Sequence, residues 1–286
     1  MGNFVVETLP AYVQENKDLL LKNFALVGGG IRQRISVQTG VKSSAAINFL
    51  EIAPVFQDGS ACGFTAQGDV TLTQRVIATK PYKVNLEICP KTLRGKYAEY
   101  LIQMNAAEHE LPFEQYIMEG VTNSINKKIE QTYWEEMSTI LADEEVTDAT
   151  YANTMYETIG NVYLAMADEA IERGAEIYVS PANFRKFLQE LVAKNFYHYA
   201  SATEAAPTEF YYPGSNVKVV MAAGVADNVV YGTFAKNFFY GCDMEGDAEV
   251  IDLWWSKDDR VFKLAAEWNM GVQVAFPNMV VVAKRA

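Results

Sequence analysis

The chain has few residues of the kinds that build metal or disulfide centres. Its 286 residues include two histidines, His109 and His198, and three scattered cysteines, Cys62, Cys89 and Cys242. No Cys-x-x-Cys occurs, and no second histidine follows His109 at zinc-protease spacing, so the ligand spacing of a zinc site is missing. An odd number of distant cysteines also argues against a disulfide framework and favours a reducing compartment. We therefore expect no metal site.

Motifs for cofactors and catalysis are missing as well. Residues 28–30 are three glycines, but they lack the Gly-Lys-Ser/Thr ending of a phosphate-binding loop, and a flexible joint is the simpler interpretation. Asp258 and Asp259 are adjacent carboxylates in a predicted turn, where aspartate is expected for turn geometry alone. Because no nucleophile, base and cofactor loop stand out together, we expect a protein that is not an enzyme and has no cofactor.

Basic charge is scarce in this chain. Lys and Arg number 24 against 36 Asp and Glu, which gives a formal net charge of -12. This balance argues against a protein that wraps nucleic acid, because phosphate neutralisation needs clustered Lys and Arg. It remains compatible with a surface that encloses nucleic acid without adhering to it. No apolar run reaches the ~18 residues of a membrane span, and the first residues lack the pattern of a secretory signal.

What the chain does have is a long apolar stripe at helical spacing. Apolar side chains recur at every fourth position, namely Phe113, Ile117, Val121, Ile125, Ile129, Tyr133 and Met137. Pro112 suits the first helical position, because it has no N–H to leave unpaired. The pattern predicts one helix over 112–141, roughly 45 Å long at ~1.5 Å per residue. Since four residues overshoot one helical turn, the stripe drifts around the axis and the helix must contact different partners along its length.

The segments before this helix have too little apolar sequence to form a core of their own. Residues 1–45 are typical of an arm, with a short amphipathic helix predicted over 10–26. Residues 46–89 alternate apolar and polar side chains around a glycine-rich turn cluster, which predicts a long two-stranded ribbon. Two strands of about ten residues reach more than ~30 Å at ~3.3 Å per residue. An isolated ribbon is marginally stable in water, so we expect this one to rest on another subunit.

The second half of the chain predicts a compact α/β region followed by further strands. Ser180 and Pro181 form an N-cap and first helical position for a helix over 181–194, and another helix is predicted over 154–172. Trp254 and Trp255 point to opposite faces of one strand, so one belongs to the core and the other marks an interface. The predicted strands cover residues 175–179, 217–221, 229–234, 250–255, 261–268, 272–276 and 279–282.

Taken in order, these parts resemble a known coat protein. An arm, a ribbon, a long helix, an α/β region and a returning β segment resemble the major capsid protein of tailed phages, the Hong Kong 97-type coat fold. Local likeness is greatest to capsid proteins of phages infecting gut bacteria. The stretches that carry it are Thr39-Gly40-Val41-Lys42 leading to Ile47-Asn48, Gly68-Asp69-Val70-Thr71-Leu72, Val84-Asn85-Leu86-Glu87-Ile88-Cys89, Val179-Ser180-Pro181-Ala182-Asn183-Phe184-Arg185 and Asn237-Phe238-Phe239-Tyr240-Gly241-Cys242-Asp243.

The resemblance implies an α+β fold with a defined division of the chain. Residues 1–45 would be the N-terminal arm and 46–90 the extended loop, a β-hairpin. Residues 91–150 and 243–286 would build the peripheral domain with the spine helix at 112–141, and 151–242 would form the axial domain. The implied contacts with neighbouring subunits lie at the loop tip and in the arm, at Asp58, Gly59, Phe64 and Gly68 and at Arg32 and Arg34.

The resemblance also implies a function and a set of partners. The chain would assemble with itself as pentamers and hexamers into an icosahedral or prolate shell that encloses the double-stranded DNA of the phage. It would assemble in the host bacterial cytoplasm and form the capsid of the virion. Implied partners are portal and head-completion proteins and a decoration protein. Only about 45 residues precede the ribbon, so a scaffold would be a separate protein or be dispensed with.

Two other interpretations stay open at this point. The same fold serves encapsulin-like cellular nanocompartments, which enclose a cargo enzyme rather than a genome. From a different class, the chain could be a soluble hydrolase or carbohydrate-binding enzyme with an unrecognised site in 151–242. The absence of a convergent polar constellation in the sequence favours a shell protein over that enzyme.

Overall fold

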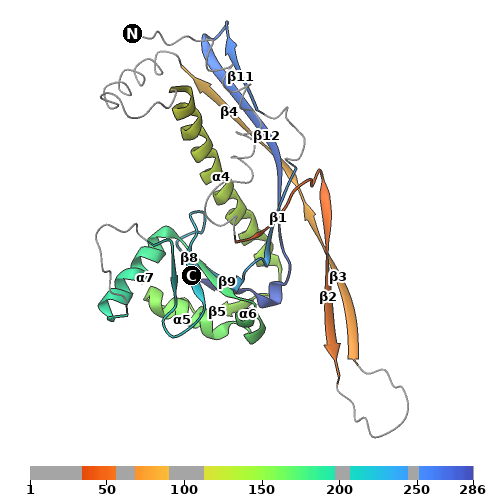
Figure 1. The fold of residues 1–286 in the computed structure, drawn as a ribbon, viewed down its shortest axis with the longest axis vertical. Coiled ribbons are helices and arrows are strands. Elements are labelled where there is room, and N and C mark those ends of the chain that lie inside the picture. Colours follow the sequence, from red (N-terminus) through yellow and green to blue (C-terminus); the bar gives the residue numbers. More distant parts are fainter. Residues whose placement is uncertain (1–33, 56–67, 90–112, 197–206, 244–250, 286) are drawn as a thin grey trace.

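Two β-sheets, one long helix and a projecting hairpin make up the described part of the chain (Figure 1). The computed structural model describes residues 34–55, 68–89, 113–196, 207–243 and 251–285. Several predictions fall outside these ranges. They are the arm helix at 10–26, the arm residue Arg32 and the loop-tip residues Asp58, Gly59 and Phe64.

The predicted long helix is confirmed. Helix α4 (Phe113–Asp143) has 31 residues and runs alongside one sheet toward the other (Figure 1). Its buried side chains include Ile125, Ile129 and Tyr133 of the predicted stripe, and also Trp134. The Trp134 ring stacks on Tyr231 of the second sheet with centroids 5.2 Å apart. The helix therefore contacts different partners along its length, as the drift of the stripe requires.

A five-stranded sheet lies along the helix. It contains β1 (Ser36–Gln38), β10 (Phe238–Cys242), β12 (Val261–Val274), β11 (Ile251–Ser256) and β4 (Lys80–Ile88), with β12 at its centre. We expected two strands, 261–268 and 272–276, where the structure has the single 14-residue β12. The ladder continues because residues 270–274 pair with β10, a contact between distant segments that local sequence does not reveal.

A six-stranded sheet forms the other layer. Its strand order is β5 (Thr147–Ala149), β13 (Val281–Lys284), β9 (Val229–Phe234), β6 (Ala175–Val179), β8 (Lys218–Met221) and β7 (Glu209–Tyr211). Alternate side chains of β6 enter different cores. Ile177 and Val179 pack in the core that includes α5 (Met155–Ala165) and α7 (Pro181–Ala193), whereas Tyr178 packs in the core that includes α4. Both faces of β6 are buried, which explains its mostly apolar sequence, and its one charged residue, Glu176, pairs with Arg34.

Local signals placed α7 correctly and misjudged the helix before it. The Ser180 hydroxyl accepts a hydrogen bond from the Asn183 amide, and Pro181 starts α7, as predicted. The helix expected over 154–172 instead divides into α5 and the short α6 (Asp168–Glu172). Met166 leaves the helical conformation with ψ at 140° and is buried. The break turns the chain so that Ala170 of α6 is also buried.

The two sheets are interleaved along the chain, which corrects the expected extent of the ribbon. Residues 46–89 do not form one ribbon, because β4 leaves the hairpin and pairs with β12. The expected boundaries near 150 and 242 also do not separate the sheets. Strand β10 joins the five-stranded sheet, and β5 and β13 join the six-stranded sheet. Pairing between distant segments decides these memberships. The division into arm, extended loop, peripheral and axial domains stays a prediction.

The two adjacent tryptophans face opposite sides of β11, as expected. Trp255 packs against the core that includes α4, with its ring 5.1 Å from that of Phe262. Trp254 is 42% exposed. That Trp254 marks an interface stays a prediction.

Replacing Ile125 with Asp tests the buried face of α4. Ile125 is 5% exposed, so Ile125→Asp places a charge among apolar side chains and should lower the free energy of unfolding by about 3 kcal/mol. Ser124→Asp adds the same charge at the exposed neighbouring position and serves as the control. Thermal or denaturant unfolding followed by circular dichroism measures both. Equal stability of the two variants would contradict the burial of this face.

Candidate assembly site at the base of the hairpin

The hairpin of β2 (Ser44–Pro54) and β3 (Gly68–Ala78) is a two-stranded sheet that projects from the body (Figure 1). Its register runs from Ser44 opposite Ala78 to Pro54 opposite Gly68. Leu72 is 70% exposed and Val76 48% exposed on one face of β3. A ribbon of two strands is marginally stable on its own, so its attachment to the body decides where it points.

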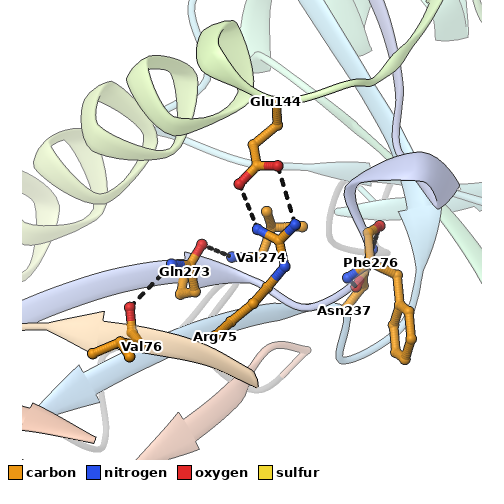
Figure 2. A network of polar contacts seen from close by, with 7 residues as sticks. All are labelled: Arg75, Val76, Glu144, Asn237, Gln273, Val274 and Phe276. Atoms are coloured by element: carbon orange, nitrogen blue, oxygen red, sulfur yellow. Dashed lines mark hydrogen bonds and ion pairs between the residues drawn. The ribbon is translucent and has the colours of Figure 1, made fainter. Parts of the chain in front are cut away.

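An ion pair holds the hairpin to the end of α4. Two nitrogens of the Arg75 guanidinium donate to the Glu144 carboxylate. Nη1 donates to Oε1, and Nη2 donates to Oε2 at 3.0 Å (Figure 2). This paired geometry is the strong form of a charge-assisted hydrogen bond. Hydrogen bonding from Arg75 holds the pKa of the Glu144 carboxyl below its ordinary value. Arg75 therefore anchors β3 to the body. The alternating sequence pattern of the strand did not single out this residue.

A backbone contact and an aromatic cluster complete the attachment. Gln273 of β12 donates from Nε2 to the Val76 carbonyl at 3.0 Å, while its Oε1 accepts from the Val274 amide at 2.9 Å (Figure 2). Phe49 of β2 lies against Phe276, with ring centroids 4.9 Å apart. Both strands of the hairpin are therefore held close to the end of β12.

The hairpin base lies at the crossing between the two sheets. Asn237 stands between β9 and β10 and is fully buried. Its Nδ2 donates to the Phe276 carbonyl at 2.9 Å and its Oδ1 accepts from the Phe276 amide at 2.8 Å (Figure 2). Phe276 lies where the chain passes from β12 to β13. One side chain therefore joins two of the chain's passages between the sheets, next to the hairpin.

A groove of about 750 Å³ runs between α4 and the strands on the hairpin side. Its lining includes Ile125 and Ile140 of α4 and Val272 of β12. At its rim, Glu136 accepts from Lys80 Nζ at 2.8 Å and from the Tyr82 hydroxyl at 2.6 Å. Burial and this hydrogen bond raise the pKa of Tyr82. The carboxylate thereby ties the start of β4 to the helix.

Two of the predicted contact residues are described, and the structure does not bring them together. Arg34 Nη1 lies 2.6 Å from Glu176 Oε1, and its Nη2 contacts Glu209, so it anchors the arm to the six-stranded sheet of its own chain. Gly68 lies opposite Pro54 at the far end of the hairpin. Contacts of either residue with a neighbouring subunit stay a prediction.

The described residues contain no group of three or more His, Cys, Asp and Glu side chains placed to hold a metal ion. Among the helices described, none is long and apolar enough to cross a membrane. Cys89 is exposed and Cys242 is buried, and no disulfide joins them.

Removing the charge of Glu144 tests the ion pair at the hairpin base. A partly buried charge-assisted hydrogen bond contributes about 1.5 kcal/mol, so Glu144→Gln should speed amide hydrogen exchange in β3 around Arg75 by roughly tenfold. Glu145→Gln makes the same change at the exposed neighbouring residue and should leave exchange unaltered. Equal exchange rates in the two variants would show that Glu144 does not hold the hairpin.

The same contact predicts a pH dependence. The pKa of Glu144 lies below its ordinary 4.5 in the folded chain, so its stabilising contribution is complete above that value. The contribution is lost as the pH falls through the lowered pKa. Exchange in β3 should therefore differ between wild type and Glu144→Gln at neutral pH, and the difference should vanish in acid. A difference that persists below the folded pKa would contradict this assignment.

Comparison with solved structures finds the same fold with little shared sequence. A chain in the satellite phage P4 procapsid, a structure that includes size determination (Sid) protein, aligns with a TM-score of 0.60 and 9% identity, covering 99% of this chain and 91% of that one. A chain of the virus-like particle from Pyrococcus furiosus aligns with a TM-score of 0.54 and 11% identity, covering 94% of this chain and 98% of that one. A chain of the capsid of an empty GTA particle aligns with a TM-score of 0.54 and 10% identity, covering 91% of this chain and 90% of that one. No protein-family model and no curated protein matches the sequence.

These alignments span nearly the whole length of the chains on both sides. This chain combines the hairpin, the long helix and the two interleaved sheets in one mixed arrangement of helices and strands. The chain therefore has the fold of these capsid structures, the Hong Kong 97-type coat fold that its sequence motifs predicted.

Proposed function

We propose that this chain is the major capsid protein of a tailed phage, a structural and non-catalytic subunit that assembles with itself into a closed shell. The observation that carries the proposal is the hairpin, which leaves the body as two strands and exposes Leu72 and Val76. Exposed apolar side chains on a marginally stable two-stranded ribbon are unfavourable in a protein that stays monomeric. In a subunit of a shell, a neighbouring copy covers them.

The proposed assembly consists of pentamers and hexamers that close an icosahedral or prolate shell by symmetry. The shell would enclose double-stranded DNA without reading its sequence, which fits a formal net charge of -12. Portal and head-completion proteins would share the shell, with scaffolding and decoration proteins as further partners, and assembly would take place in the host bacterial cytoplasm. The likeness to phages of gut bacteria rests on the sequence motifs alone.

The proposed contacts between subunits involve the ends of the arm and the hairpin. Asp58, Gly59, Phe64 and Gly68 would contact a neighbour at the loop tip. Arg32 and Arg34 would do so in the arm, with Arg34 anchoring the arm to its own subunit through Glu176.

A second candidate is a cellular nanocompartment of the encapsulin type. The match to the virus-like particle from Pyrococcus furiosus supports keeping it, because that particle comes from a cellular organism and shares this fold over 98% of its own chain. Gene neighbours separate the two candidates. Portal and terminase genes beside this gene indicate a phage, whereas a gene for a cargo enzyme indicates a compartment.

Expression of the full chain, with size-exclusion chromatography and negative-stain electron microscopy, tests the shell itself. We expect closed particles of megadalton mass, from the chain alone or with a scaffolding protein encoded beside it. A compact monomer whose melting temperature rises with a small ligand would overturn the proposal and favour an enzyme with a site in 151–242.

Deleting residues 57–68 tests the role of the hairpin tip. The α/β region should stay folded, because the described residues of the two sheets and α4 already pack into two hydrophobic cores, and its melting temperature should be unchanged. Particle formation should be weakened or abolished. A variant with 57–68 replaced by glycine and serine of equal length separates loss of the tip side chains from shortening of the loop. Normal particles from both variants would count against contacts at the tip.

A further inference from the structure

Two glycines stand opposite each other in the middle of the five-stranded sheet. Gly241 of β10 pairs with Gly271 of β12, and both are buried. Neither adopts the positive φ that would require glycine. Glycine weakens the interior of a strand relative to alanine, and in that position it often marks a close approach of another backbone. The two residues therefore need an explanation other than their own backbone conformation.

The explanation is the close approach of the hairpin. A Cβ atom on Gly241 would lie 2.8 Å from Ile77 Cγ2 of β3. On Gly271 it would lie 2.6 Å from the Ala78 carbonyl oxygen and 2.9 Å from Ile77 Cγ2. All three distances are shorter than non-bonded carbon–carbon or carbon–oxygen contacts, so a larger residue at either position would push β3 away. Ile77 is fully buried, and its Cγ2 occupies the space that a Cβ atom on either glycine would take. We call Gly241, Gly271 and Ile77 the glycine seat.

The glycine seat lies where a small displacement has a large effect. From Arg75, next to the seat, to Gly68 the strand β3 extends roughly 23 Å at ~3.3 Å per residue, so a tilt of about 5° moves its far end by about 2 Å. The contacts of the seat, of Arg75 and of Gln273 lie at the near end of the hairpin, and Phe49 lies at its middle, opposite Thr73. The angle at the base therefore sets where the tip lies.

We propose that the glycine seat sets the angle at which the hairpin leaves the body, and thereby the curvature with which copies of this chain join. The proposal rests on the proposed function as a shell subunit. A closed shell of pentamers and hexamers requires the angle between neighbours to stay within a narrow range, because an interface that does not close by symmetry continues as an open array. A hairpin fixed by close backbone packing supplies such an angle better than one held by flexible side chains.

A compensating pair of substitutions tests the glycine seat in the full chain. Gly241→Ala places a methyl group against Ile77 Cγ2, and we expect folded subunits that yield particles of altered diameter, open sheets or tubes, and severalfold fewer closed shells. Ile77→Ala removes the clashing atom, and Ile77 Cβ lies 3.8 Å from the added methyl group, an ordinary contact. The double variant Gly241→Ala/Ile77→Ala should therefore regain the particle diameter of the wild type. Gly120→Ala, on α4 with no atom within 4 Å of the added methyl group, is the matched control and should assemble normally.

Electron microscopy of the particles and circular dichroism of the subunits decide the outcome. A particle distribution of Gly241→Ala equal to that of Gly120→Ala overturns the proposal, and so does a double variant that assembles no better than Gly241→Ala. Loss of the folded circular dichroism signal in Gly241→Ala also overturns it, because the seat would then serve only core packing. If the wild type forms no particles, the proposed shell function fails instead, which separates the two failures.

Discussion

The structure depends on one constraint, which is that a ribbon of two strands cannot bury its own side chains. The hairpin of β2 and β3 has no third strand, and Leu72 is 70% exposed. Apart from its own cross-strand pairing, the ribbon is held within its chain mainly at and near its base. There, Ile77 is fully buried between two glycines and Arg75 pairs with Glu144. Contacts with the body are therefore concentrated at the base, and the described outer part of β3 has none of those named above. This arrangement fits a hairpin that a neighbouring molecule covers.

The two sheets of the body are joined at the places where the chain passes between them. The chain passes between the sheets after β9 and again after β12, and Asn237 joins these two passages with hydrogen bonds to Phe276. Helix α4 also joins the sheets, because Trp134 stacks on Tyr231 of one sheet and lies 5.9 Å from Phe238 of the other. Phe49 of the hairpin packs against Phe276, so the hairpin contacts the same junction between the sheets.

Much of the candidate site escaped sequence reasoning for identifiable reasons. Arg34 was singled out in the arm, although its partner Glu176 lies 142 positions away and could not be named. Arg75 and Glu144 each look like ordinary surface charges, and only folding brings them together. A signal for the glycine seat was available, since an isolated glycine inside a strand pattern indicates close backbone approach. Gly271 was instead placed between two expected strands, at 261–268 and 272–276, so it was not recognised as a glycine inside a strand.

The sequence by itself determined the elements whose signals are local. The stripe of α4, the cap at Ser180 with Pro181, the buried run of β6 and the turn between β11 and β12 each depend on neighbours within a few residues. The order of these elements also sufficed to identify the fold. Only the tertiary structure decided that β4 pairs with β12, that β13 joins β9, and that Ile77 lies between Gly241 and Gly271. These contacts join segments that are far apart in the chain. Their contribution to stability exists only once the segments have come together, so no local sequence pattern predicts them.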